Sequence, residues 1–331
     1  MNITRMRRCH SAYRSPLSDA EFASRREQAV SVTLNEPYLG VEAQRIYYDF
    51  RERTAAFDLI REVVPVTYAL HAGSDAGRLI SDSLARLEAC GSVEEVDAVF
   101  ADCRARWDEA GFGARLTNDK EGAWHRSLLV AGLDRAHGHV VDMGNHNNGF
   151  GDYLLRVNPA VKHVTGVDHR NDPNVLTGER LDFVHQDDVT KVPLDDDSAD
   201  TVAFRVALHH WTKPVQEALL AEAARIVRPG GEILIVEDSW ADRPGLTDNA
   251  LTQQYRKLSG EDKVAALSLI DVSSCLMKEE TVAYPMSYRS AAEWESMITA
   301  LGATSIDSTY WGFTMFTVYG APMLVTRATM A

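Results

Sequence analysis

The feature that most constrains this chain is a change of rhythm at His139. From there onward, short runs rich in valine and isoleucine alternate with stretches of helical periodicity. Alternating strand and helix units of this kind predict a parallel sheet covered by helices on both sides. We therefore expect a doubly wound, Rossmann-like α/β fold. The strand-like runs are 139–143, 163–168, 181–187, 200–206, 232–238, 304–311 and 321–327.

The first part of the chain has a different pattern. Over residues 1–134 apolar side chains recur at three- and four-residue steps, which predicts helices, one of them between about 42 and 63. We therefore divide the chain into a helical N-terminal region, 1–134, and an α/β domain, 135–331. Residues 240–287 form a long insertion after the fifth strand, with a helical middle at 249–278, and we expect it to contribute to a lid.

The net charge of the chain limits the classes of molecule that it is expected to bind. The 331 residues include 34 Lys+Arg and 48 Asp+Glu, a net charge of −14. This balance argues against a nucleic-acid or anionic membrane surface and favours a small-molecule partner. The basic start has no apolar core of a secretory signal, and no apolar run approaches the ~18 residues of a membrane span, so we expect a cytoplasmic protein. The four cysteines are scattered, and no metal is expected. The oligomeric state stays open.

The residues that could hold a ligand stand at the ends of the predicted strands. In an open α/β sheet, ligands bind beyond the carboxyl ends of strands, at the point where the strand order reverses. Charged and polar residues, together with Gly144 and Val189, stand at or just beyond the ends of the first four strands at this edge. They are Asp142, Gly144, Asn145 and His146 after the first strand, Asp168 and His169 after the second, Asp187, Asp188 and Val189 after the third, and Arg205, His209 and His210 after the fourth.

Between about 139 and 238 these motifs resemble the class I S-adenosylmethionine (SAM)-dependent methyltransferases, especially their small-molecule branch. That family has an Asp-x-Gly-x-Gly-x-Gly loop after the first strand, an acid ending the second, and an Asp five residues before a Pro after the third. A Leu-His-His run often follows the fourth strand, and an Arg-x-x-x-Pro-Gly-Gly run precedes the fifth. Here the last of these is Arg225–Gly231. The resemblance covers roughly the last 195 residues and implies a seven-stranded sheet.

The resemblance also implies roles for residues, with SAM as the cofactor. Asp142 and Gly144 would shape the loop under the methionine part of SAM, with Asn145 beside them. Asp168, followed by His169, would accept both ribose hydroxyls. Asp188, preceded by Asp187, would accept from the adenine amino group, with Val189 behind it. Arg205 would place its backbone carbonyl beside the methionyl amine.

The first loop departs from the family pattern. His146 and Asn148 stand where the second and third glycines are expected. Asn tolerates a left-handed backbone, whereas the ring of His146 would stand where the methionine tail rests. The Asn145–Asn148 segment has two readings: a hydrogen-bonded turn, or polar groups around the methionyl amine and carboxylate.

These features predict a SAM-dependent enzyme that transfers a methyl group to a small metabolite. His209 and His210 are candidates for a general base, and adjacent side chains are expected to point to different sides, so that one faces the substrate. An alternative is a SAM-consuming cyclase similar to azetidine-2-carboxylate synthases, in which the amine of SAM attacks its own γ-carbon and expels methylthioadenosine. A third hypothesis is a catalytically silent binding protein, against which Asp142, Asp168 and Asp188 argue.

Overall fold

The computed structural model describes residues 43–118, 120–170, 172–239, 246, 249–277, 287–313 and 320–331. Its centre is a seven-stranded sheet of order β3-β2-β1-β4-β5-β7-β6. Every pairing is parallel except those of β7, which is antiparallel to both neighbours. The predicted α/β sheet is thus confirmed. The strands are β1 (Gly138–Met143), β2 (Val161–Asp168), β3 (Leu181–His185), β4 (Ala199–Arg205), β5 (Val227–Asp238), β6 (Ala303–Phe313) and β7 (Pro322–Met330).

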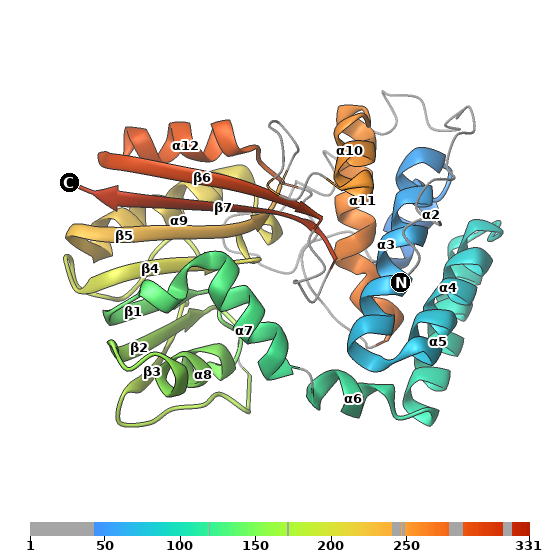
Figure 1. Cartoon of the computed structure of the whole chain (residues 1–331), viewed down its shortest axis with the longest axis horizontal. Helices are drawn as coiled ribbons and strands as arrows, with labels where there is room; N and C mark the ends of the chain where they lie inside the picture. Colours follow the sequence, from blue (N-terminus) through green and yellow to red (C-terminus); the bar gives the residue numbers. More distant parts are fainter. Residues whose placement is uncertain are drawn as a thin grey trace.

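Helices cover both faces of the sheet (Figure 1). Because successive strand residues point to opposite faces, Val140 and Val141 belong to two different apolar clusters. One face packs against α7 (Lys120–Ala131) and α8 (Gly149–Val157). The other packs against α9 (Lys213–Ile226) and α12 (Ala291–Ala300). Helix α7 therefore covers the sheet, although its residues fall inside the region expected to form a separate helical layer.

The remaining helices form a second layer beside the sheet (Figure 1). Helix α11 from the insertion is buried along Val264–Ile270 and packs against α3 and α2. The insertion is thus part of the core of this layer. Residues 1–42 of the predicted helical region lie outside the described residues. The layer contains α2 (Ala43–Phe50), α3 (Thr54–Ala72), α4 (Ser74–Glu88), α5 (Val93–Glu109), α6 (Phe112–Asn118), α10 (Ala250–Arg256), α11 (Gly260–Asp271) and the short helix η4 (Val272–Leu276).

The prediction of a single helix between about 42 and 63 is wrong. Helix α2 ends at Phe50 and α3 begins at Thr54. Arg53 lies in the break, and its buried guanidinium is 3.0 Å from Asp262 of α11. The periodicity of apolar residues predicts one continuous helix here, whereas the structure has a break at which Arg53 pairs with Asp262. No helix among the described residues is long and apolar enough to cross a bilayer.

Candidate functional site

The loop after β1 keeps the backbone shape of a glycine loop. Gly144, His146 and Asn148 all have positive φ angles, of +70°, +64° and +66°. Asn148 then starts α8. The ring of His146 turns outward, with 53% of its side chain exposed and Nε2 3.3 Å from Asp172. The two non-glycine residues thus preserve the loop, and the ring of His146 lies at the surface.

Two buried asparagines fasten this loop to β2 and to the chain before and along β3. The amide of Asn145 donates to Oδ1 of Asn148, whose own amide donates to the carbonyls of Leu176 (2.9 Å) and Asp182 (2.8 Å). Both side chains pack on Gly166 of β2, where a Cβ atom would overlap them. Oδ1 of Asn145 is buried and has no hydrogen-bond partner among the described residues. Asn148 thus forms the hydrogen-bonded turn, while Asn145 offers an acceptor.

Asp142 and Arg205 form a bidentate ion pair across the ends of β1 and β4. Nε of Arg205 lies 3.1 Å from Oδ1 of Asp142, and Nη2 lies 2.9 Å from Oδ2. The guanidinium also stacks on Phe150, 3.6 Å from the ring centroid. The family resemblance implies a role only for the backbone carbonyl of Arg205, whereas in the structure its side chain pairs with Asp142. This ion pair could have been predicted from the sequence, because Asp142 and Arg205, 63 positions apart, have opposite charges and each end a predicted strand.

Asp168 joins the first two loops. Its Oδ2 accepts from the backbone N–H of His146 at 2.8 Å, and its Oδ1 accepts from that of Arg170 at 2.8 Å. The guanidinium of Arg170 lies 3.3 Å from the same carboxylate. Beside it, the ring of His169 packs edge-on against Trp211, and burial lowers its pKa to about 4. His169 is therefore neutral at physiological pH.

The loop after β3 is a tight turn. Oδ1 of Asp188 accepts from the hydroxyl of Thr190 at 2.6 Å and from its backbone N–H at 2.9 Å, and these bonds lower the pKa of Asp188. Val189 is buried behind the turn. Asp187 is almost fully exposed and lies 3.4 Å from His185. Val189 thus lies buried next to the turn formed by Asp188, whereas Asp187 faces solvent.

Comparison with known proteins identifies the domain that contains these loops. Residues 142–235 match the family model described as a methyltransferase domain. A ubiquinone/menaquinone biosynthesis C-methyltransferase (UbiE) from Methylobacterium nodulans is 32% identical over 167 residues, covering 46% of this chain and 62% of the relative. A demethylmenaquinone methyltransferase from Clavibacter sepedonicus is 41% identical over 151 residues, covering 44% and 58%. Residues 142–235 therefore form a methyltransferase domain.

The chain thus spans less than two thirds of the length of these two curated relatives. Among solved structures, the SAM-dependent methyltransferase SibL is similar with a TM-score of 0.46 and 18% identity, over 84% of this chain and 77% of SibL. A Burkholderia thailandensis 1,6-didemethyltoxoflavin-N1-methyltransferase solved with S-adenosylhomocysteine has a TM-score of 0.42 and 17% identity, over 70% and 89%.

The turn after β4 is organised by a buried carboxylate. Glu237 of β5 accepts from the backbone N–H groups of Ala207 (2.7 Å) and Leu208 (2.6 Å). Its other oxygen lies 2.6 Å from Nδ1 of His209. Val206, just before the turn, has φ +52°, a conformation that costs a non-glycine residue about 1–3 kcal/mol. Glu237 is not among the site residues predicted from the sequence, although it is an acid near the end of an apolar strand.

The two histidines of the methyltransferase domain converge on one carboxylate. They lie in the short helix η3 (Leu208–His210), with ring centroids 4.2 Å apart. Nε2 of His209 and Nδ1 of His210 lie 3.7 and 3.9 Å from Oδ2 of Asp271, at the end of α11. The expectation that the rings point to different sides is therefore wrong, because the tight helical turn brings them together.

The charges around His209 keep it protonated. Burial by itself lowers the pKa of His209, but Glu237 and Asp271 outweigh that effect and raise it well above the usual value. The same two histidines hold the pKa of Asp271 below its usual value in spite of burial. Asp238, next to Glu237, has its pKa raised to about 7 by burial. A raised pKa favours the protonated form of His209, which has no free nitrogen with which to accept a proton as a general base.

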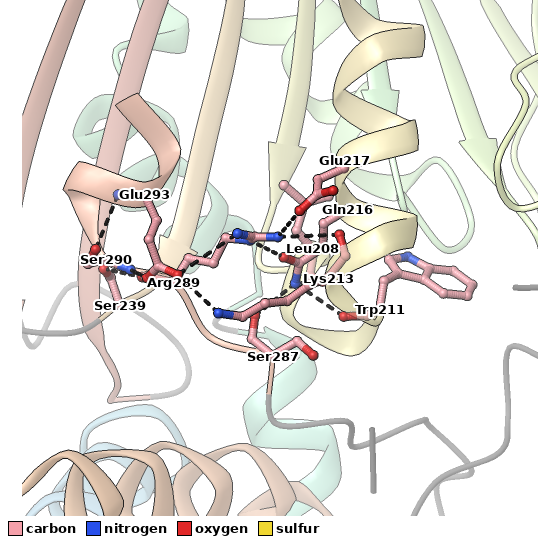
Figure 2. A network of polar contacts seen from close by, with 10 residues as sticks. All are labelled: Leu208, Trp211, Lys213, Gln216, Glu217, Ser239, Ser287, Arg289, Ser290 and Glu293. Carbon is pink, nitrogen blue, oxygen red and sulfur yellow. Dashed lines mark hydrogen bonds and ion pairs between the residues drawn. The ribbon is translucent and has the colours of Figure 1, made fainter. Parts of the chain in front are cut away.

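A polar network ties this turn to the end of the insertion (Figure 2). The buried amide of Gln216 donates to the carbonyls of Leu208 (2.9 Å), Trp211 (3.1 Å) and Ser287 (2.8 Å). Nε of Arg289 donates to the amide oxygen of Gln216 at 2.6 Å. These contacts connect the histidine turn to α9 and to the segment where the chain returns from the insertion, so the backbone of the turn is held from several sides.

Proposed function

We propose that this protein is a SAM-dependent methyltransferase that acts on a small molecule. The observation that carries the proposal is the loop after β1, with left-handed backbone at positions 144, 146 and 148, fastened by Asp168 to the end of β2. It lies where β1 separates β2 from β4, the switch point at which α/β sheets bind ligands. The matched methyltransferase domain begins at this loop.

The residues at this edge suit SAM. Oδ1 of Asn145, which is buried and has no hydrogen-bond partner among the described residues, would accept from the methionyl amine. Asp168 would accept from the ribose hydroxyls once the guanidinium of Arg170, which is 30% exposed, moves away. Asp188 and the buried Val189 would border the adenine. When bound, SAM supplies an electrophilic methyl group for in-line displacement.

We place the acceptor at the ends of β4 and β5, beneath the helical layer. The protein would act there mainly by positioning the two reactants and excluding water. Of the two histidines, His210 is the one an acceptor can reach, since 24% of its side chain is exposed compared with 2% for His209. His209 would act as a positioning residue through Glu237. The acceptor would be a small metabolite.

The cyclase alternative is motivated by the ring of His146 and by the Asn145–Asn148 cluster. That ring lies at the surface beside Asp172, so methyl transfer is the reaction we propose. One incubation separates the two reactions. The full chain with SAM and no acceptor should leave SAM unchanged by mass spectrometry, whereas rapid formation of methylthioadenosine would overturn methyl transfer in favour of cyclisation.

Cofactor binding is tested by calorimetry with SAM and S-adenosylhomocysteine. We expect the Asp168→Asn variant to bind about tenfold or more weakly, because it loses a charged hydrogen-bond acceptor. The matched control is Asp152→Asn, an exposed acid on α8 that pairs with Arg156. If neither ligand binds the native chain, the proposal fails and the silent binding protein is favoured.

Acceptor identity is tested by a screen for S-adenosylhomocysteine formation. Quinols are the first class to try, because both curated relatives are named for steps of menaquinone biosynthesis. Product formation with one acceptor class, lost in Asp168→Asn and kept in Asp152→Asn, is the expected result. Turnover that is equal in both variants would show that it does not depend on this site.

A further inference from the structure

We infer that His209, His210 and Asp271 form a binding site for a divalent transition-metal ion, with Zn²⁺ the best match. Their ligand atoms all lie within 4.8 Å of one another, and within the described part of the chain no other group of three or more such residues does so. The sequence predicts no metal site, because Asp271 comes from the insertion and no spacing motif links it to the histidines.

The distances suit a tetrahedral ion. Oδ2 of Asp271 is 3.7 Å from Nε2 of His209 and 3.9 Å from Nδ1 of His210. Ligand atoms bonded to zinc at about 2.0–2.2 Å lie about 3.4 Å apart in tetrahedral geometry. Both separations exceed the length of a hydrogen bond and are only slightly wider than this value. Small side-chain rotations would close the site around an ion.

His209 is already oriented as a ligand. Its Nδ1 is held by Glu237 at 2.6 Å, while its Nε2 is buried without a hydrogen-bond partner among the described residues. Metal-bound histidines almost always have their other ring nitrogen held by a carboxylate or a carbonyl, which fixes the ring and raises its basicity. Glu237 is itself held by two backbone N–H groups. The arrangement therefore supplies both a ligand and its supporting residue.

The charges facing the site favour a dication. The groups that act electrostatically on His209 include Glu237 and Asp271, and His209 in turn acts on Asp238. These carboxylates come from β5 and α11. Glu237 lies 2.6 Å from Nδ1 of His209, and Asp271 lies 3.7 Å from its Nε2. A divalent ion bound here would therefore lie close to carboxylates.

The donor set selects the kind of ion. Two imidazoles and one carboxylate suit zinc and other first-row ions, whereas magnesium and calcium prefer oxygen ligands. Three protein ligands also leave a fourth position for a small molecule. Because the ligands come from η3 and α11, the ion would join the sheet to the helical layer.

The test measures zinc bound by the full chain after chelator treatment and reloading. We expect about one tightly bound ion per chain, by metal analysis and by competition with a chromogenic chelator. His210→Ala and Asp271→Asn should each weaken binding about a hundredfold or more, and Glu237→Gln about 10–100-fold. The matched control is His163→Ala, which removes an imidazole 2.9 Å from Asp182 on the surface of the sheet.

Two further measurements keep the result interpretable. Circular dichroism identifies a variant that has lost its fold, and the d–d absorption of bound Co²⁺ reports tetrahedral coordination in those that keep it. The metal site is overturned if the native chain retains no zinc, or if His210→Ala and the control bind zinc equally. Calorimetry with S-adenosylhomocysteine on the same samples tests the proposed function separately.

Discussion

Glu237 and His209 face each other across the ends of β5 and β4, with Oε2 of the carboxylate 2.6 Å from Nδ1 of the ring and both side chains buried. The second carboxylate oxygen accepts from two backbone N–H groups of the turn that carries His209. One buried carboxylate thus shapes the turn and balances the charge of its histidine. This double role makes the pair a determinant of stability as well as of site geometry.

The Glu237–His209 pair should make stability depend on pH. Because the folded-state pKa of His209 is raised, its contribution is fully present below the unfolded value of about 6.5 and is lost as pH rises through the folded-state pKa. Glu237→Gln should therefore cost about 3 kcal/mol near pH 6, with a smaller cost at higher pH. Urea unfolding of the native chain and the variant, with chelator present, measures the difference in the free energy of unfolding at each pH. A cost that does not change with pH would contradict this assignment.

Gly166→Ala should disrupt the first loop. Its methyl group would overlap the side chains of Asn145 and Asn148, and such overpacking costs about 1–3 kcal/mol. We also expect weaker binding of S-adenosylhomocysteine, because the loop would shift. Gly178→Ala is the control, since nothing lies within 4 Å of the added methyl group. Unfolding and calorimetry of the two variants should differ, and equal behaviour would contradict the packing argument.

Arg205→Ala should destabilise the protein strongly. It leaves the buried carboxylate of Asp142 without its bidentate partner, and breaking a buried ion pair costs about 3–5 kcal/mol. Arg228→Ala removes a more exposed guanidinium, 3.0 Å from Asp200, and should cost about 1 kcal/mol or less. Denaturant unfolding compares them. A loss at Arg205 no larger than at Arg228 would show that solvent compensates Asp142.

Arg170→Ala should strengthen cofactor binding. In the structure its guanidinium lies against Asp168, the proposed ribose acceptor, so binding of SAM has to break this ion pair first. Removing that competition should lower the Kd for S-adenosylhomocysteine by up to about fivefold, the effect of a partly exposed ion pair of about 1 kcal/mol. Calorimetry measures it. Weaker binding would instead mean that Arg170 contacts the cofactor.

The sheet was predictable because its strands are short apolar runs that need no distant partner to be recognised. The break between α2 and α3 was not, because Arg53 interrupts the helix to pair with Asp262, 209 positions away. The position of α7 on the sheet was also hidden, since helical periodicity shows that a helix has an apolar face but not what that face packs against.

For the site, the acids at strand ends could be predicted from topology alone. The contacts that define their chemistry could not. Arg170 competes for Asp168 through a side chain that no spacing rule assigns, and Asp271 reaches the histidines only because the insertion folds back on the sheet. The outward direction of the His146 ring, beside Asp172, likewise follows from no spacing rule.

Helix α11 has a consequence for how the chain folds as it is made. It fills the core of the helical layer against α2 and α3, but the ribosome adds it only after β1–β5 are complete. At about 5–20 residues per second, the N-terminal helices would wait on the order of ten seconds for the helix that buries their apolar sides. During synthesis those helices are exposed to chaperones and to one another, and a nascent chain arrested before residue 260 should aggregate.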